Sequence, residues 1–218
     1  TVSAADLIAT LPGISMSHNG PLGGFTAVRI RGAQGEQTLA LIDGVKVNDP
    51  SSPGGGFDFG ALLTDTIDRI EVLRGPNSVP WGSEAIGGVI NIVTAQPKSG
   101  LSGSAQGEYG YGDATRLVGR ISGGNSRIRA TFGGGWFTQD GISAFKNGSE
   151  ADGLKQYGAN GRIDMDLTPG IALDLRGWYT HSRIEQDGFP PPLYGFADTS
   201  DYVVSEQIVG YAGLKAQT

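Results

Sequence analysis

The stretch of sequence that decides the fold is residues 74–94, RGPNSVPWGSEAIGGVINIVT. Gly75 and Pro76, near its start, end whatever element precedes them. Glycines at 82, 87 and 88 permit tight turns and a close approach of two backbones. The closing run VINIVT is β-branched and typical of a buried strand. On its own, a glycine-rich turn that leads into a strand indicates only an α+β or an all-β domain.

A nucleotide-binding loop is an alternative interpretation of these glycines, and it would imply a soluble enzyme. However, no Gly-Lys-Ser or Gly-Lys-Thr sequence closes the loop, and no helical pattern follows it. No nucleophile elbow or comparable catalytic set occurs elsewhere. We therefore predict that the chain is not an enzyme. Soluble expression with nucleotide affinity at residues 82–88 would support the alternative.

The composition favours strands joined by tight turns. Hydrophobic residues make up 38% of the 218 residues and 37 residues are glycine, which argues against a large helical core. The chain has no cysteine, which fits an envelope protein without disulfides as well as a reducing compartment. No apolar run reaches the length of a transmembrane helix, but this does not exclude membrane strands, whose alternating signal is weaker. The net charge of −6 argues against nucleic acid as a partner.

Short elements and turns follow one another through residues 1–97. The expected elements are a helix that starts at Ser3 and ends before Pro12, strands at 14–16 and 28–30, a hairpin over 39–47, a helix over 61–68 and a strand over 70–73. Asp43 and Gly44 form the hairpin turn, because this pair tolerates the positive φ angles of a tight turn. Glycine and proline mark loops at 18–24 and 48–56.

The pattern changes after residues 95–100, and long alternating segments follow. We expect about six strands with one apolar and one polar face, at 101–111, 115–123, 126–139, 155–168, 170–185 and 202–217. Short turns and two long loops, 140–154 and 185–201, join them. Strand length and terminal aromatic residues favour an outer-membrane barrel over a soluble sandwich, whose strands are usually shorter. The aromatic residues are Tyr109, Tyr111, Trp136, Phe137, Tyr157, Trp178, Tyr179 and Tyr211.

Four motifs in a fixed order carry a family resemblance. IRG at 30–32, LIDGV at 41–45 and IEVLRGP at 70–76 precede GGVINIVT at 87–94. This series resembles the plug domain of TonB-dependent outer-membrane receptors, most closely the vitamin B12 (cobalamin) receptor type. The resemblance implies an α+β plug domain over 1–97, with a small mixed sheet and short helices. It also implies the N-terminal part of a transmembrane β-barrel of antiparallel strands over 98–218.

The same resemblance implies a longer receptor. Closing a plugged barrel takes roughly 22 strands, and an open strand edge is unacceptable in lipid. We therefore expect this chain to be the N-terminal portion of the whole protein. The family engages TonB through a short N-terminal segment, which we expect to precede this chain. TonB, a small-molecule substrate and lipid of the bacterial outer membrane are thus the implied partners.

Charged residues lie beside apolar strand residues in the plug region. They are Arg29, Arg31, Asp43, Glu71 and Arg74. Ordinary solvated strand edges would explain them equally well. The resemblance implies instead that they contact the inner wall of the barrel. Such contacts would hold the plug while still permitting movement, because little free energy is needed to separate hydrated ion pairs.

Two loops, 18–25 and 48–59, would form the apex of the plug. Glycine and proline already explain both as plain loops. The resemblance implies that loops at these places touch substrate. The expected contacts are Phe25, Phe57 and Phe59, with Asn48 and Asp49 as polar groups.

Acidic residues in the two long loops are candidate calcium ligands. They are Asp140, Glu150, Asp152 and Asp187. Loop acids are usually just solvated, but hard cations take several oxygen ligands that converging loops can supply. The cobalamin receptor type resembles this arrangement, although residues 148–153 hold fewer aspartates than its pattern. We expect no cofactor other than such a structural Ca²⁺.

The function implied by the resemblance is active uptake of a scarce substrate across the outer membrane. Cobalamin-like corrinoids, iron–siderophore chelates and oligosaccharides are the candidate substrates. The alternative is a passive outer-membrane surface protein, an adhesion or docking barrel without energised transport. Deleting residues 1–97 from the full-length protein should leave its function intact if that alternative holds.

Overall fold

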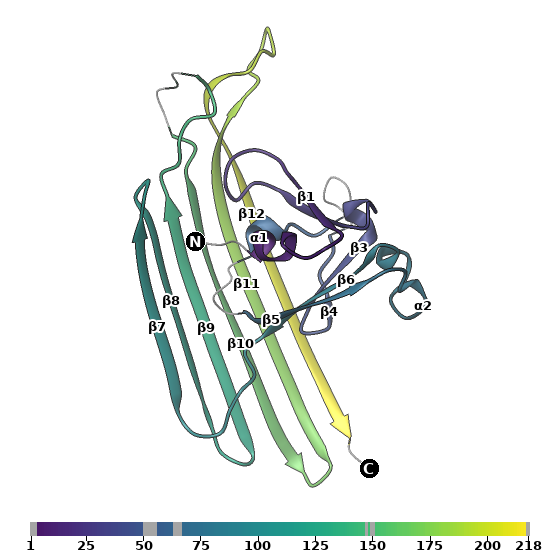
Figure 1. The fold of residues 1–218 in the computed structure, drawn as a ribbon. Helices are drawn as coiled ribbons and strands as arrows, with labels where there is room; N and C mark the ends of the chain where they lie inside the picture. Colours follow the sequence, from purple (N-terminus) through teal and green to yellow (C-terminus); the bar gives the residue numbers. More distant parts are fainter. Residues whose placement is uncertain (1–3, 50–55, 63–66, 147, 149–150, 217–218) are drawn as a thin grey trace. The chain divides into compact units, whose positions relative to one another are not determined.

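The computed structural model describes residues 4–49, 56–62, 67–146, 148 and 151–216 (Figure 1). The chain divides into two compact units. The first, here called the plug unit, comprises Thr1–Asn19 and Phe25–Gln96. The second, here called the wall unit, comprises Gly20–Gly24 and Pro97–Thr218. The short loop Gly20–Gly24 therefore groups with the later strands rather than with its sequence neighbours.

The plug unit is a small mixed α+β structure, as expected. Strand β1 (Ile14–His18) pairs with β2 (Thr26–Ile30), and a separate four-stranded sheet has the order β4-β3-β6-β5. Its strands are β3 (Thr38–Ile42), β4 (Val45–Lys46), β5 (Ile67–Arg74) and β6 (Gly88–Thr94). β3 and β6 run parallel, whereas β5 and β6 run antiparallel. The helical elements among the described residues are α1 (Ala4–Ala9), α2 (Ser78–Trp81), η1 (Gly35–Gln37), η2 (Phe59–Ala61) and η4 (Ser83–Ala85).

The stretch from 74 to 94 closes on itself before it enters the sheet. Gly75 N–H donates to the Gly87 carbonyl at 3.1 Å, and Gly87 N–H donates to the Gln37 carbonyl at 2.9 Å. A Cβ on Gly87 would lie 2.6 Å from that of Ala33, so only glycine fits there. The run that follows becomes β6, which is buried at Val89 and Ile90. Val89 packs with Leu39, Leu41 and Ala85 in one core cluster.

The hairpin at Asp43 and Gly44 is confirmed. Their φ angles are 50° and 82°, which matches a tight turn with two positive φ values. The expected helix over 61–68 is contradicted at its two ends, because a 3-10 turn ends at Ala61 and β5 already begins at Ile67. Residues 63–66 of that prediction lie outside the described residues.

The wall unit is one antiparallel sheet of six consecutive strands, β12-β11-β10-β9-β8-β7. They are β7 (Ser102–Gly110), β8 (Ala114–Gly124), β9 (Ile128–Gln139), β10 (Leu154–Thr168), β11 (Ile171–Gly188) and β12 (Ala197–Ala216). Connections 125–127 and 169–170 lie at one end of the sheet. Connections 111–113, 140–153 and 189–196 lie at the other, here called the long-loop end. Residues 185–188 and 197–201 continue the β11–β12 ladder, so the second loop is shorter than expected.

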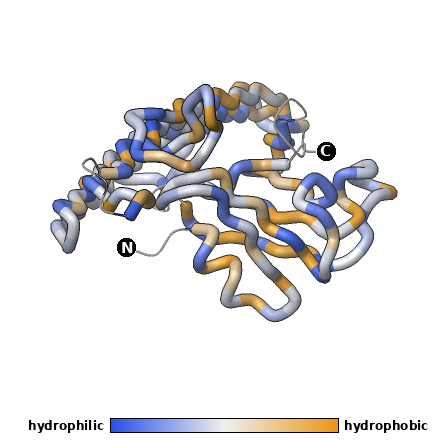
Figure 2. The backbone as a smooth tube through the Cα atoms, turned by 90° about the horizontal axis from the view of Figure 1, so that it is seen from above, coloured by the Kyte–Doolittle hydropathy of each residue, from blue (hydrophilic) through white to orange (hydrophobic). Residues whose placement is uncertain are grey.

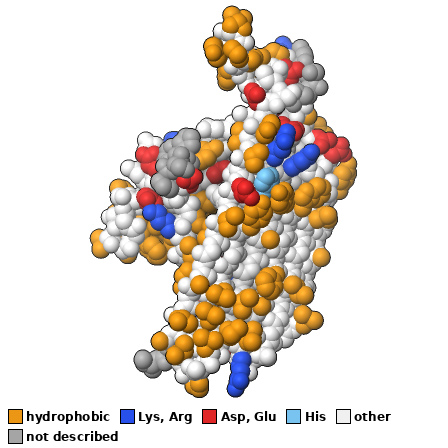
Figure 3. Space-filling model, turned by 180° about the vertical axis from the view of Figure 1, so that it is seen from behind, with side chains coloured by type: hydrophobic (Ala, Val, Ile, Leu, Met, Phe, Trp, Pro, Cys, Tyr) orange, Lys and Arg blue, Asp and Glu red, His pale blue; other side chains and the backbone are white. Residues whose placement is uncertain are grey.

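One face of this sheet is apolar and the other mainly polar. Figure 2 shows the colour alternating between hydrophobic and hydrophilic along the long strands, and Figure 3 shows a broad hydrophobic area on them. Trp136 and Tyr157 are cross-strand partners on the apolar face and are 40% and 43% exposed. This arrangement is what strands with one face toward lipid require. The described residues contain no helix long and apolar enough to cross a membrane.

Not every expected aromatic residue lies on the apolar face. Phe137 and Trp178 are buried, and each alternates with an apolar-face neighbour along its strand. Tyr211 pairs in register with Arg176 on the polar face, and its ring lies 4.9 Å from that guanidinium carbon. These three residues therefore belong to the polar face, because side chains alternate strictly along a strand.

Candidate functional site: a cavity at the long-loop end

A cavity of about 560 Å³ lies within the wall unit at the long-loop end. Its apolar lining includes Leu22, Ile142, Leu154 and Phe196. Its polar lining includes Gln139, Ser143, Asp152, Gln186 and Asp187. A largely apolar hollow with a few placed polar groups is the usual form of a small-molecule site.

Asp187 fastens the loop 140–153 to the end of the β11–β12 pair. One carboxylate oxygen accepts hydrogen bonds from Phe145 N–H at 2.7 Å and Ser143 Oγ at 3.1 Å. The other oxygen accepts from Thr199 N–H at 3.0 Å. Asp152 stabilises the same loop from within, since its carboxylate accepts a hydrogen bond from Ala144 N–H at 2.6 Å. Charge-assisted bonds of this kind fix loop backbone more firmly than neutral ones.

Three phenyl rings gather beside these carboxylates. The ring centroid of Phe196 lies 6.0 Å from that of Phe145 and 5.5 Å from that of Phe189. Both spacings are within the range of favourable aromatic pairs. Sequence reasoning missed this group, because its members lie in two loops that only the strand pairing brings together.

The expected calcium ligands do not form a metal site as they are arranged. Among the residues that the structure describes, no group of three acidic, histidine or cysteine side chains could hold a metal ion. Asp140 is exposed, and both Asp152 and Asp187 accept backbone N–H groups. Glu150 lies outside the described residues. The calcium site stays a prediction, which calorimetric titration of the full-length protein with Ca²⁺ tests.

The residues of the plug loops that were expected to contact substrate differ in their exposure and in their hydrogen bonds. Phe25 is half-buried and Asp49 is exposed. Asn48 holds the backbone of β3: it accepts from Ala40 N–H at 2.7 Å and donates to the Thr38 carbonyl at 3.2 Å. Asn48 is therefore at least partly a structural residue.

Phe57 and Phe59 are core side chains, so the prediction that they contact substrate is wrong for this structure. They are 2% and 1% exposed, and their rings meet edge to face at 4.9 Å. Asp58 between them accepts backbone N–H bonds from Thr26 and Gly60, both at 2.9 Å. Burial raises the pKa of Asp58, and those bonds lower it only in part.

Two of the five charged plug residues are already engaged inside the plug unit. Asp43 accepts from Thr94 N–H at 2.9 Å. Glu71 accepts from Asn91 Nδ2 at 2.9 Å and pairs with Arg69 at 2.8 Å. The hydrogen bond from Asn91, aided by Arg69, holds the pKa of Glu71 below its ordinary value.

The remaining three, Arg29, Arg31 and Arg74, form no ion pair with the described acids of the plug unit. Arg31 takes a left-handed φ of 52° and is exposed, as is Arg74. Arg29 is half-buried, and its Nε atom has no hydrogen-bond partner in the described chain.

The polar face of the wall carries a charge cluster that the sequence did not single out. Asp174 is 1% exposed, and three cations surround its carboxylate. Arg162 Nη2 lies 3.3 Å away and Lys215 Nζ 2.7 Å away, while Arg176 forms the third pair. Alternation along β11 places Asp174 and Arg176 on one face, but it does not show that this carboxylate is the centre of the cluster.

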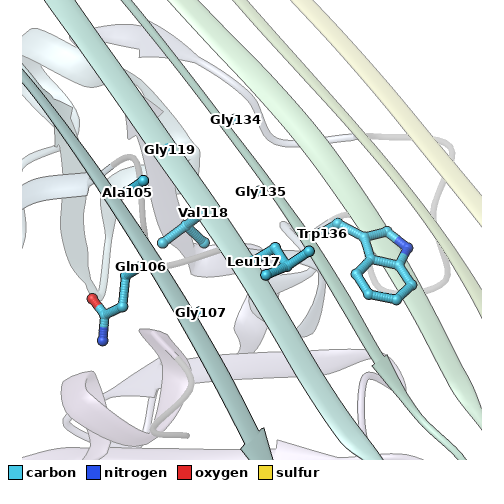
Figure 4. A pocket seen from close by; sticks show the side chains of 9 residues that line it. All are labelled: Ala105, Gln106, Gly107, Leu117, Val118, Gly119, Gly134, Gly135 and Trp136. Atoms are coloured by element: carbon cyan, nitrogen blue, oxygen red, sulfur yellow. The ribbon is translucent and has the colours of Figure 1, made fainter.

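A second hollow of about 520 Å³ lies over β7, β8 and β9 (Figure 4). Small residues make much of it, among them Gly107, Gly119 and Gly134, and the side chains of Leu117 and Trp136 border it. None of its lining residues is titratable. It offers little for orienting a ligand, and the long-loop cavity is therefore the better candidate site.

Comparison with known proteins identifies the fold and its family. Residues 1–89 match the family described as TonB-dependent Receptor Plug Domain. Over 186 residues the chain is 31% identical to a vitamin B12 transporter, BtuB, of Vibrio vulnificus, covering 84% of this chain and 30% of that protein.

Solved structures agree on the architecture. The ferric yersiniabactin uptake receptor FyuA of Yersinia pestis matches 98% of this chain and 35% of its own, with a TM-score of 0.74 and 20% identity. The siderophore receptor PirA of Pseudomonas aeruginosa matches 84% of this chain and 31% of its own, with a TM-score of 0.62 and 26% identity. The chain thus spans about a third of the length of these relatives.

The plug unit agrees with the family match, and the wall unit agrees with the partial match to plugged-barrel receptors. The chain belongs to the TonB-dependent receptors of the bacterial outer membrane, of which it holds the plug domain and a run of antiparallel barrel strands.

Proposed function

We propose that the whole receptor takes up a scarce substrate, a cobalamin-like corrinoid or an iron–siderophore chelate, by TonB-dependent active transport. The observation that carries this proposal is the plug domain followed by barrel strands, with a ligand-sized cavity at the long-loop end. The relatives named above, a vitamin B12 transporter and two siderophore receptors, support both substrate classes.

Substrate enters at the cavity. Outer-membrane barrels carry their longer loops on the extracellular side, so the long-loop end faces outward. Apolar lining such as Leu22 and Phe196 contacts the body of the ligand, while the Gln139 and Gln186 amides orient its polar groups. Outer-membrane lipid surrounds the apolar face of the strands.

The plug then acts as the gate. Ligand binding shifts an N-terminal segment of the whole receptor, and that segment engages TonB. Force applied through TonB rearranges the plug and opens a path. The three arginines Arg29, Arg31 and Arg74 contact the inner wall and release it, since hydrated ion pairs are weak enough to exchange. Asp43 and Glu71 instead keep the plug sheet together. No covalent chemistry is involved.

The test is uptake by cells that carry the full-length gene. Labelled cyanocobalamin and a labelled ferric siderophore are supplied separately, each with and without TonB. The proposal predicts that one of them accumulates and that accumulation vanishes without TonB. Entry of neither compound under either condition would contradict the proposed substrate classes.

A further inference from the structure

The cavity at the long-loop end has no positive group in its lining. Among its lining residues, all of which the structure describes, none is lysine, arginine or histidine. Two are carboxylates, Asp152 and Asp187. A ligand in this cavity therefore meets negative charge on a largely apolar surface.

One carboxylate oxygen among these lining residues has no hydrogen-bond partner in the described chain. Asp152 is 4% exposed, and its Oδ2 already accepts from Ala144 N–H. Its Oδ1 is buried and has no hydrogen-bond partner in the described chain. A carboxylate only accepts hydrogen bonds, and a buried acceptor without a donor is costly. A ligand N–H or O–H group would remove that cost where the surrounding loop adjusts to let it reach this buried oxygen.

Acids outnumber bases around the cavity. The acids of the loops and strand ends there are Asp140, Asp152, Glu185, Asp187, Asp198 and Asp201. Lys146 is the one base in the described parts of residues 140–153 and 185–201, and just outside these ranges Arg183 pairs with Glu185 at 3.6 Å. Clefts lined by one sign of charge focus the electrostatic field, so that ligands of opposite charge are attracted and ligands of like charge are repelled as they approach.

We infer that this sector of the receptor mouth selects an uncharged or cationic ligand that brings hydrogen-bond donors, and rejects polyanionic chelates. The inference rests on the proposed function and narrows its substrate range. Two carboxylates near a trianion, partly screened by salt, weaken binding by about tenfold or more. Neutral ligands with amide groups and apolar surface meet no such opposition.

The experiment is equilibrium binding to the purified full-length receptor. The probes are cyanocobalamin, a neutral ferric trihydroxamate and a trianionic ferric triscatecholate. We expect at least one neutral probe to bind, and the trianion to bind about tenfold more weakly or worse at low salt. Added salt should narrow this difference by screening the carboxylates.

A matched pair of variants isolates the charge. Gln186→Lys places a cation in the lining, and Gln186→Met removes the amide at similar length without adding charge. The lysine variant should improve binding of the trianion by about tenfold and leave the neutral probes no better bound. The methionine variant should not change the preference for neutral probes over the trianion.

Two different results would count against these ideas, and they can be told apart. If the unaltered receptor binds the trianion as tightly as the neutral probes, the inference that the cavity rejects polyanions is wrong. The proposal of active transport is unaffected by that result. If none of the three probes binds, the proposed substrate classes fail, and the inference fails with them.

Discussion

Replacing Asp174 by asparagine should destabilise the wall far more than its single lost charge suggests. The carboxylate is 1% exposed and holds Arg162, Arg176 and Lys215 together on the polar face. A neutral amide at this position would keep the shape but remove the negative charge that two poorly hydrated guanidinium groups share. Among the described acids, Arg162 would then be paired with Asp164, at 3.1 Å.

The magnitude follows from burial. Breaking a buried ion pair by removing one partner costs about 3–5 kcal/mol. Lys215 is half-exposed, with 51% of its side chain accessible, so water compensates for part of the loss. We therefore expect Asp174→Asn to lower the free energy of unfolding by about 2–4 kcal/mol.

Asp166→Asn is the matched control in the same wall. Asp166 pairs with Arg129 at 3.7 Å, and 42% of its side chain is exposed. Exposed pairs of this kind contribute less than about 1 kcal/mol. Urea unfolding of the full-length protein in lipid vesicles, followed by the gel-mobility shift of folded barrels, measures both variants. Equal losses for the two variants would refute the reasoning from burial.

Three further changes test the plug and the cavity. Gly88→Ala should destabilise the plug by about 2–3 kcal/mol, because a Cβ there would meet the Leu73 carbonyl; protease sensitivity of the plug is the readout. The control Gly177→Ala meets nothing within 4 Å and should be tolerated. The raised pKa of Asp58 means that the folded state keeps its proton to higher pH than the unfolded chain. Asp58 therefore lowers the free energy of unfolding progressively as the pH rises from its unfolded pKa through its folded pKa. Asp58→Asn should remove that pH dependence in amide hydrogen exchange. Asp187→Ala should release the loop between β9 and β10 and weaken ligand binding by about tenfold; unchanged proteolysis of that loop would contradict this role.

Local chemistry made part of the fold predictable. The Asp43–Gly44 turn follows from two positive φ angles that few residue pairs tolerate. The wall strands follow from strict alternation, which also separates Trp178 from Tyr179. The sequence alone therefore held enough to place Trp178 with Asp174 on the polar face.

Tertiary packing determines which side chains are buried and which loops meet, and the local sequence pattern does not show this. Phe57 and Phe59 lie in a segment rich in glycine and aspartate, which is typical of an exposed loop, yet their rings fill the plug core. The Phe196 group depends on which loops the strand register brings together. Asp174 is one of several alternating charges, and only burial distinguishes it from Asp166.

In the proposed mechanism the plug couples substrate entry to TonB. The most direct measurement compares accumulation of the transported ligand by the full-length receptor and by a form lacking residues 1–97, each with and without TonB. We expect that accumulation by the full-length receptor requires TonB, while any entry through the plugless form does not depend on TonB. Equal accumulation by the full-length receptor with and without TonB would contradict the claim and favour a passive barrel.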